Sequence, residues 1–222
     1  LRSEGGKSFS FNTLDGARQF YNGKARGSWD PTDVMSGREV LILGTGPGVA
    51  AHRPALESFI RRTRPLVLAL NTQSAVAPEL IDLRIACHPV RLLADAEAHA
   101  DLPQPLITPA SMLSESLRSE LGDKRLLDFG LGVEPGRFEF HATHCIAPAP
   151  LVLAYALAVA TSGQATRILM AGFDGYPDGD PRNEETAAVF DAYRSHADEK
   201  RLISITPTRH RLRGVSIYAP MI

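Results

Sequence analysis

Short runs of consecutive apolar residues alternate along the chain with stretches in which apolar side chains recur every three or four positions. The first pair is the apolar run 39–43, which is followed after a glycine turn by a helical pattern at 52–63. Such a run is typical of a strand buried on both faces, and the spacing in 52–63 is typical of an amphipathic helix. Further strands are expected at 66–70, 83–87, 106–108, 138–141, 167–171, 202–205 and 215–218.

The segments between these runs favour helices or loops. Helices are expected at 92–99, 111–121, 183–197 and, apolar nearly all round, at 148–162. The stretch 122–137 is glycine-rich and charged. Because β and α patterns alternate, we predict an α/β fold with a mostly parallel, Rossmann-like sheet and helices on both faces. Residues 1–37 are expected to be an arm or linker, and 38–222 one ligand-binding domain.

Composition narrows the function classes. The chain has 222 residues, 44% of them hydrophobic, and a net charge of −1, so no strong field indicates nucleic acid as a partner. No apolar run has membrane-spanning length and no signal peptide is visible, so a cytoplasmic protein is expected.

Metal and redox chemistry find little support in the sequence. Cys87 and Cys145 lie in apolar surroundings and are expected to be buried free thiols. His141 and His144 are three apart, but no third ligand accompanies them. We therefore expect no metal site, and a histidine pair in a loop or at a strand edge.

The turn after the first strand is the first candidate binding site. It reads Gly44-Thr45-Gly46-Pro47-Gly48, and glycines let a backbone approach a phosphate or ribose closely. The alternative is a plain tight turn between strand and helix. The pattern is not the dinucleotide fingerprint, because Val49 stands where its third glycine belongs and Asn71 follows the second strand in place of an acid.

Polar residues also follow other predicted strands. Asn71, His88 and Asp174 each come at or just after a strand end, and the carboxyl ends of parallel strands form the ligand-binding edge of α/β proteins. We expect the three to gather with the glycine turn. For His88 the alternative is a hydrogen bond to a nearby carbonyl.

Two arginines extend this prediction. Arg182 and Arg209 follow strand ends, so their guanidinium groups are expected near the glycine turn, where they could bind phosphate or carboxylate, with Thr206 and Thr208 adding hydroxyl donors. The alternative is that Arg182 pairs with an aspartate of 178–180 and that Arg209 is solvated.

These motifs resemble one superfamily. Leu-Gly-Thr-Gly-Pro-Gly at 43–48, Asn71, and an Ala-rich helix before Ile-Leu-Met-Ala-Gly-Phe-Asp-Gly at 168–175 are similar to archaeal MptE-like (DUF115) hydroxymethylpterin diphosphokinases and to bacterial sialyltransferases that use CMP-sugars. The resemblance covers about 39–176. Gly48 replaces the usual serine of Gly-x-Gly-Pro-Ser, so one hydroxyl contact to the nucleotide or phosphate is missing.

A second resemblance spans the compact part of the chain. The segments 86–89, 171–176, 180–182 and 205–208 are similar to the C-terminal domain of long bacterial proteins in which an HMG-CoA-lyase-like (aldolase-like) barrel comes first, often in surface-polysaccharide synthesis. A chain that begins with Leu1 agrees with a domain taken from such a parent. That barrel is then an expected partner within one parent protein, and its catalytic residues lie outside this chain.

Three functions remain as hypotheses. The first is a glycosyltransferase-like enzyme that binds a nucleotide-activated sugar, with CMP as the expected carrier, and uses His88 or Asp174 as the base. The second is a diphosphokinase, with Mg²⁺ held by Asp174, Asp178 and Asp180. The third is a non-catalytic module that binds a sugar phosphate or assembles with the aldolase-like parent. A second copy of the chain is a further candidate partner.

Overall fold

The first apolar run forms the centre of a large parallel sheet in the computed structural model, which describes residues 24–198 and 201–218. Eight strands lie in the order β11-β10-β9-β1-β2-β3-β4-β5, and every neighbouring pair is parallel. The expected parallel sheet is therefore confirmed. The strands are β1 (Glu39–Leu43), β2 (Leu66–Leu70), β3 (Leu83–Ile85), β4 (Leu106–Thr108), β5 (Leu126–Asp128), β9 (Arg167–Ala171), β10 (Leu202–Ser204) and β11 (Arg213–Gly214).

The strand order reverses beside β1. From β1 the chain adds β2 to β5 on one side, and it later returns to place β9 on the other side of β1. Leu43 and Ala171, the last residues of β1 and β9, are register partners. In open parallel sheets such a reversal is the switch point, where the loops leaving two neighbouring strands part and leave room for a ligand.

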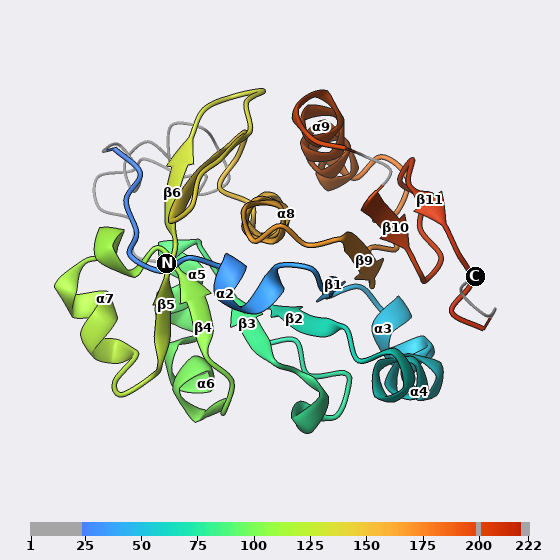
Figure 1. Cartoon of the computed structure of the whole chain (residues 1–222), viewed down its shortest axis with the longest axis horizontal. Coiled ribbons are helices and arrows are strands. Elements are labelled where there is room, and N and C mark those ends of the chain that lie inside the picture. The colour runs from blue at the N-terminus through green and yellow to red at the C-terminus, as the bar shows by residue number, and fades with distance from the viewer. Residues whose placement is uncertain (1–23, 199–200, 219–222) are drawn as a thin grey trace.

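Helices cover both faces of this sheet, as predicted (Figure 1). Alternate side chains of β1 point to opposite faces: Val40 and Ile42 pack with α8 and α9, whereas Leu41 and Leu43 pack with α4. The helices are α2 (Thr32–Met35), α3 (Gly48–Ala51), α4 (Arg53–Thr63), α5 (Pro89–Ala94), α6 (Ala96–Asp101), α7 (Glu115–Glu120), α8 (Val152–Ser162) and α9 (Pro181–His196), with 3₁₀ turns η1 (Pro78–Leu80) and η2 (Ala110–Met112).

A small second sheet explains why α8 is apolar nearly all round. It contains β6 (Gly130–Val133), β7 (Glu139–Phe140) and β8 (His144–Ala147), in the order β6-β8-β7. Strands β7 and β8 contact α8, which lies between the two sheets (Figure 1). Since α8 is covered on two sides, its residues 153–160 are all buried.

Several predicted boundaries were wrong. The glycine-rich, charged stretch 122–137, for which no strand was expected, contains β5 and β6. The predicted strand 215–218 is not a strand, and the last strand is β11, immediately before it. The single helix expected at 92–99 is two short helices, α5 and α6, and the one expected at 111–121 begins as the turn η2.

The predicted arm lies partly outside the described residues, which start at 24. From that point the chain is tied to the domain, because the backbone N–H groups of Ser28 and Trp29 both donate to the carbonyl of Asp128 at 2.9 Å. Met35 in α2 is fully buried in the main core.

Cys87 and Cys145 are buried thiols and do not form a disulfide, as predicted. Burial raises the pKa of Cys87 to about 12, and it also raises the pKa of Cys145. Both groups are therefore protonated at neutral pH. Within residues 24–198 and 201–218, no helix has the length and apolarity needed to cross a bilayer.

Candidate functional site

The glycine turn lies at the switch point and is bonded to the loop that leaves β9. The N–H of Gly44 donates to the carbonyl of Ala171 at 2.8 Å, and the N–H of Gly46 donates to the carbonyl of Gly172 at 2.9 Å. Thr45 and Pro47 are exposed. The loops that follow β1 and β9 are thus hydrogen-bonded to each other at the carboxyl ends of the two strands.

The carboxylate of Asp174 lies inside this turn. Its Oδ2 accepts the N–H of Gly48 at 3.1 Å, and a Cβ added at Gly46 or Gly48 would collide with the carboxylate. Close approach is the reason that the turn needs glycine at these two positions. The anion that the turn holds is thus the protein's own carboxylate.

The loop leaving β10 joins the same assembly. The N–H of Gly172 donates to the hydroxyl of Thr206 at 3.0 Å, and the hydroxyl of Thr208 donates to the carbonyl of Phe173 at 2.5 Å. The N–H of Arg209 donates to the carbonyl of Asp174 at 3.2 Å. Both threonines, expected to offer hydroxyls to a ligand, therefore fix the backbone that carries Asp174.

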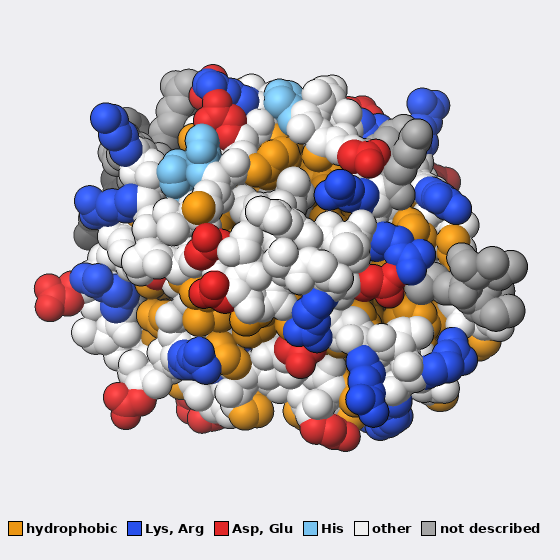
Figure 2. Space-filling view, viewed as in Figure 1, with side chains coloured by type: hydrophobic (Ala, Val, Ile, Leu, Met, Phe, Trp, Pro, Cys, Tyr) orange, Lys and Arg blue, Asp and Glu red, His pale blue; other side chains and the backbone are white. Residues whose placement is uncertain are grey.

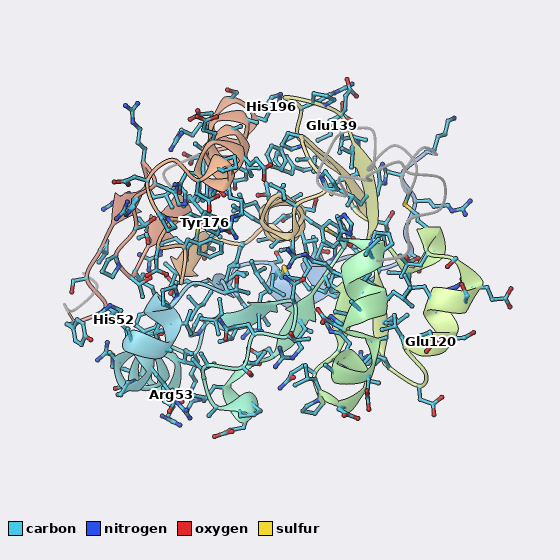
Figure 3. The ribbon with its side chains drawn as sticks, turned by 180° about the vertical axis from the view of Figure 1, so that it is seen from behind. His52, Arg53, Glu120, Glu139, Tyr176 and His196 are labelled. Carbon is cyan, nitrogen blue, oxygen red and sulfur yellow. The ribbon has the colours of Figure 1, made fainter. Side chains whose placement is uncertain are left out.

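Both predicted arginines are paired within the neighbouring loop. The guanidinium of Arg182 donates to both carboxylate oxygens of Asp180, at 2.9 and 2.6 Å, and lies 4.0 Å from the centre of the Tyr176 ring (Figure 3 labels Tyr176). The bonds from Arg182 lower the pKa of Asp180 to about 2. Arg209 pairs with the exposed Asp178. An anionic ligand would have to compete with these carboxylates.

Asn71 and His88 follow β2 and β3 at the same edge of the sheet. Asn71 has a left-handed backbone, with φ of 51°, and its N–H donates to the carbonyl of Ile85 at 2.8 Å. His88 is the residue before α5. His88 follows β3, and Asp174 follows β9. Since β1 and β2 lie between these two strands, β3 and β9 are three strand spacings, about 14 Å, apart. The two candidate bases thus belong to different parts of the edge.

Gln73 and Arg84, which belong to none of the predicted motifs, support the turn from behind. Arg84 is fully buried; its Nη1 donates to the carbonyl of Gln73 at 2.7 Å, and its Nε to Oε1 of Gln104 at 2.8 Å. The amide of Gln73 in turn donates to the carbonyl of Gly44. A charged residue inside the apolar run 83–87 was the one signal that could have revealed this support.

A pocket of about 350 Å³ adjoins the loop after β10. It lies between residues 204–208 and 212–218, and His52 and His210 complete its wall. Figure 3 shows His52 on the side of the molecule where the C-terminal strands lie. The Nδ1 of His52 lies 2.9 Å from the hydroxyl of Tyr218. The pocket was not predicted, because residues 215–218 were expected to form a strand and instead line it.

Neither the surface charge nor a metal-binding group of the described residues marks out a further ligand site at this edge. Acidic and basic side chains are both present around the face shown in Figure 2, in keeping with the net charge of −1. Among the described residues, no three His, Cys, Asp or Glu side chains gather as a metal site. His141 and His144 stack at 4.3 Å between ring centres, and Glu139 bonds His141 at 3.2 Å.

Comparison with known proteins identifies the fold. No protein-family model and no curated protein matches the chain. A similar solved structure is the MAf glycosyltransferase from Magnetospirillum magneticum AMB-1, with a TM-score of 0.58 and 12% sequence identity over 93% of this chain. This chain spans 38% of the length of that protein. At this identity the likeness shows a shared fold.

Proposed function

We propose that this domain is glycosyltransferase-like and binds a nucleotide-activated sugar at the switch point, with CMP as the expected carrier and surface-polysaccharide synthesis as the setting. The observation that carries the proposal is the Asp174 carboxylate, held where the loops after β1, β9 and β10 meet. The shared fold with a glycosyltransferase supports it, and so do the resemblances in sequence.

The carboxylate has the geometry of a base for an acceptor hydroxyl. Oδ2 of Asp174 is fixed by the N–H of Gly48, whereas Oδ1 has no hydrogen-bond partner among the described residues. In the proposed transfer the acceptor oxygen bonds to the anomeric carbon of the donor, its proton passes to Asp174, and the anomeric C–O bond breaks as the nucleotide leaves. A carboxylate held in place in this way loses little orientational freedom when the acceptor binds.

The remaining predicted residues are assigned by their place on the edge. The glycine turn and Asn71 lie on the β1 and β2 side of Asp174 and are proposed to contact the donor nucleotide. Arg182 and Arg209 would serve its phosphate after exchanging their aspartate partners. The diphosphokinase alternative is less favoured, because Asp174, Asp178 and Asp180 do not gather as a metal-binding group among the residues that the structure describes.

Calorimetry tests the binding step. We expect CMP to bind more tightly than UMP, GMP or AMP; no binding of any of the four at millimolar concentration would overturn the proposal. The catalytic step is tested by release of CMP from a CMP-linked sugar. Asp174→Asn should slow this release at least tenfold, whereas Asp123→Asn, at an exposed aspartate before β5, should not.

Binding of a nucleotide without any release would contradict the transferase and favour the non-catalytic module. Assembly with an aldolase-like barrel would then be tested by co-purification of this domain with such a barrel produced as a separate chain.

A further inference from the structure

The pocket beside the loop after β10 is separate from the glycine turn but shares a wall with it. Residues Thr206–Thr208 line the pocket, and the hydroxyls of the same two threonines bond the backbone of 172–173. His52, which follows α3, closes the other side. One loop thus has the pocket on one side and the segment leading to Asp174 on the other.

The lining of the pocket carries no formal charge. None of the thirteen lining residues that the structure describes is Asp, Glu, Lys or Arg. Ile205 and Ile217 are buried and form an apolar part of the wall, and Val215 is partly buried beside them. A charged ligand would find no counter-ion here and would lose its hydration without compensation.

Neutral polar groups complete the lining. Burial lowers the pKa of His210, so that its imidazole is neutral at pH 7 and offers one donor and one acceptor. Neither ring nitrogen of His210 bonds to any described residue, and the ring is held against Phe190 at 5.3 Å between centres. His52 and Tyr218 add an aromatic edge, with ring centres 5.9 Å apart.

We propose that this pocket binds the uncharged sugar ring of the acceptor. A sugar ring needs both donors and acceptors for its hydroxyls and an apolar or aromatic surface for its C–H face, and this lining offers both without charge. Only the role of this sugar as the acceptor rests on the proposed function. The shared loop places a sugar in this pocket next to the segment that carries Asp174, the proposed base.

The test follows the imidazole signals of His210 and His52 by NMR of the full chain. We expect saturable shifts on addition of an uncharged monosaccharide from a panel of glucose, galactose and N-acetylglucosamine. His210→Phe keeps a ring against Phe190 and removes both nitrogens, so it should weaken this binding at least tenfold. His196→Phe, at an exposed histidine of α9, is the matched control and should leave it unchanged.

Two outcomes would overturn the proposal. One is the absence of shifts with every sugar of the panel. The other is that cytidine or N-acetylneuraminic acid shifts these signals while the uncharged sugars do not, because the pocket would then serve the nucleoside or a charged sugar.

The nucleotide calorimetry separates this test from that of the proposed function. If sugars bind with the expected dependence on His210 but no nucleotide binds, the transferase fails and the pocket stands as a sugar site. If His210→Phe weakens CMP instead of the sugars, the acceptor assignment is wrong even though the transferase stands.

Discussion

At the scale of single residues, the glycine turn is shaped by one carboxylate. The three heavy atoms nearest to a Cβ at Gly48 all belong to Asp174. We therefore expect Gly48→Ala to lower the free energy of unfolding by about 1–3 kcal/mol, as overpacking does. In an Asp174→Ala background the same change should cost less, because the colliding atoms are gone and the two sites are not additive.

Urea denaturation of the wild type, both single variants and the double variant measures this coupling. Gly214→Ala is the control, since a Cβ there meets open space. An equal cost of Gly48→Ala in the two backgrounds would contradict the account of the turn.

Arg84 is the second residue whose effect should reach the turn. Lysine keeps its charge but cannot reproduce the separate bonds to Gln73 and Gln104, so Arg84→Lys should cost about 1.5–3 kcal/mol of unfolding free energy. Because the amide of Gln73 holds the carbonyl of Gly44, CMP affinity should fall as well.

Denaturation and calorimetry on the same samples check both effects. The control is Arg62→Lys, an exposed arginine of α4. Unchanged stability of Arg84→Lys would show that the buried guanidinium does not support the loop.

The sequence allowed part of this arrangement to be predicted. Parallel strands have their carboxyl ends at one edge, so the glycine turn, Asn71, His88 and Asp174 lie on the same edge of the sheet, although the strand order separates His88 from Asp174. What could not be predicted is that Asp174 occupies the turn, because that contact joins residues 126 positions apart and depends on β9 pairing beside β1. The separation of His88 from Asp174 likewise follows from the strand order alone.

At the scale of elements, the long periodic segments were predictable and the short ones were not. Continuous apolar sequence predicts the strands β1, β2 and β9 and the helix α8. In contrast, β5 and β6 are three and four residues long, and the glycines of β6 conceal its pattern. Gly130 is required because the backbone of Arg26 passes against it, a tertiary contact that no local pattern reveals.

The carboxylate of Asp128, at the end of β5, should decide how firmly the segment before α2 is held. It accepts the N–H of Ser111 at 2.8 Å and the hydroxyl of Ser28 at 3.1 Å. Asp128→Ala leaves these donors without their acceptor, so a loss of about 1–3 kcal/mol of unfolding free energy is expected. Hydrogen exchange at residues 24–30 should become faster.

Asp123→Ala, at an exposed aspartate before β5, is the control for this variant. If exchange at 24–30 is the same in both variants, the carboxylate does not hold that segment, and the two bonds to the Asp128 carbonyl suffice.

At the scale of the whole molecule, α8 joins two sheets into one structure, and the sheet edge on which the site lies is built from loops of both halves of the chain. The first half supplies the glycine turn, the support from Arg84 and the His52 wall of the pocket, and the second supplies Asp174, the threonines that fix it and the rest of the pocket. The site therefore forms only when the whole sheet has formed, and its integrity should follow global stability.

That stability should fall as the solution becomes mildly acidic. His99 on α6 is only 1% exposed, and its burial, with Lys124 and Arg84 nearby, holds its pKa below the ordinary value against the opposing charge of Asp95. Burial also lowers the pKa of His210. In the unfolded chain these histidines take up protons near pH 6.5, whereas in the folded protein they resist protonation. The unfolded state thus binds more protons as pH falls below about 6.5, and unfolding becomes easier.

Urea denaturation at pH 7.5, 6.5 and 5.5 measures this dependence. His99→Gln removes one group whose protonation favours unfolding, so its stability should decline less steeply over this range than that of the wild type, whatever its stability at pH 7.5. His196→Gln, at an exposed histidine, should keep the wild-type slope. Equal slopes for His99→Gln and the wild type would mean that His99 is protonated equally in both states, contrary to its burial beside two cations.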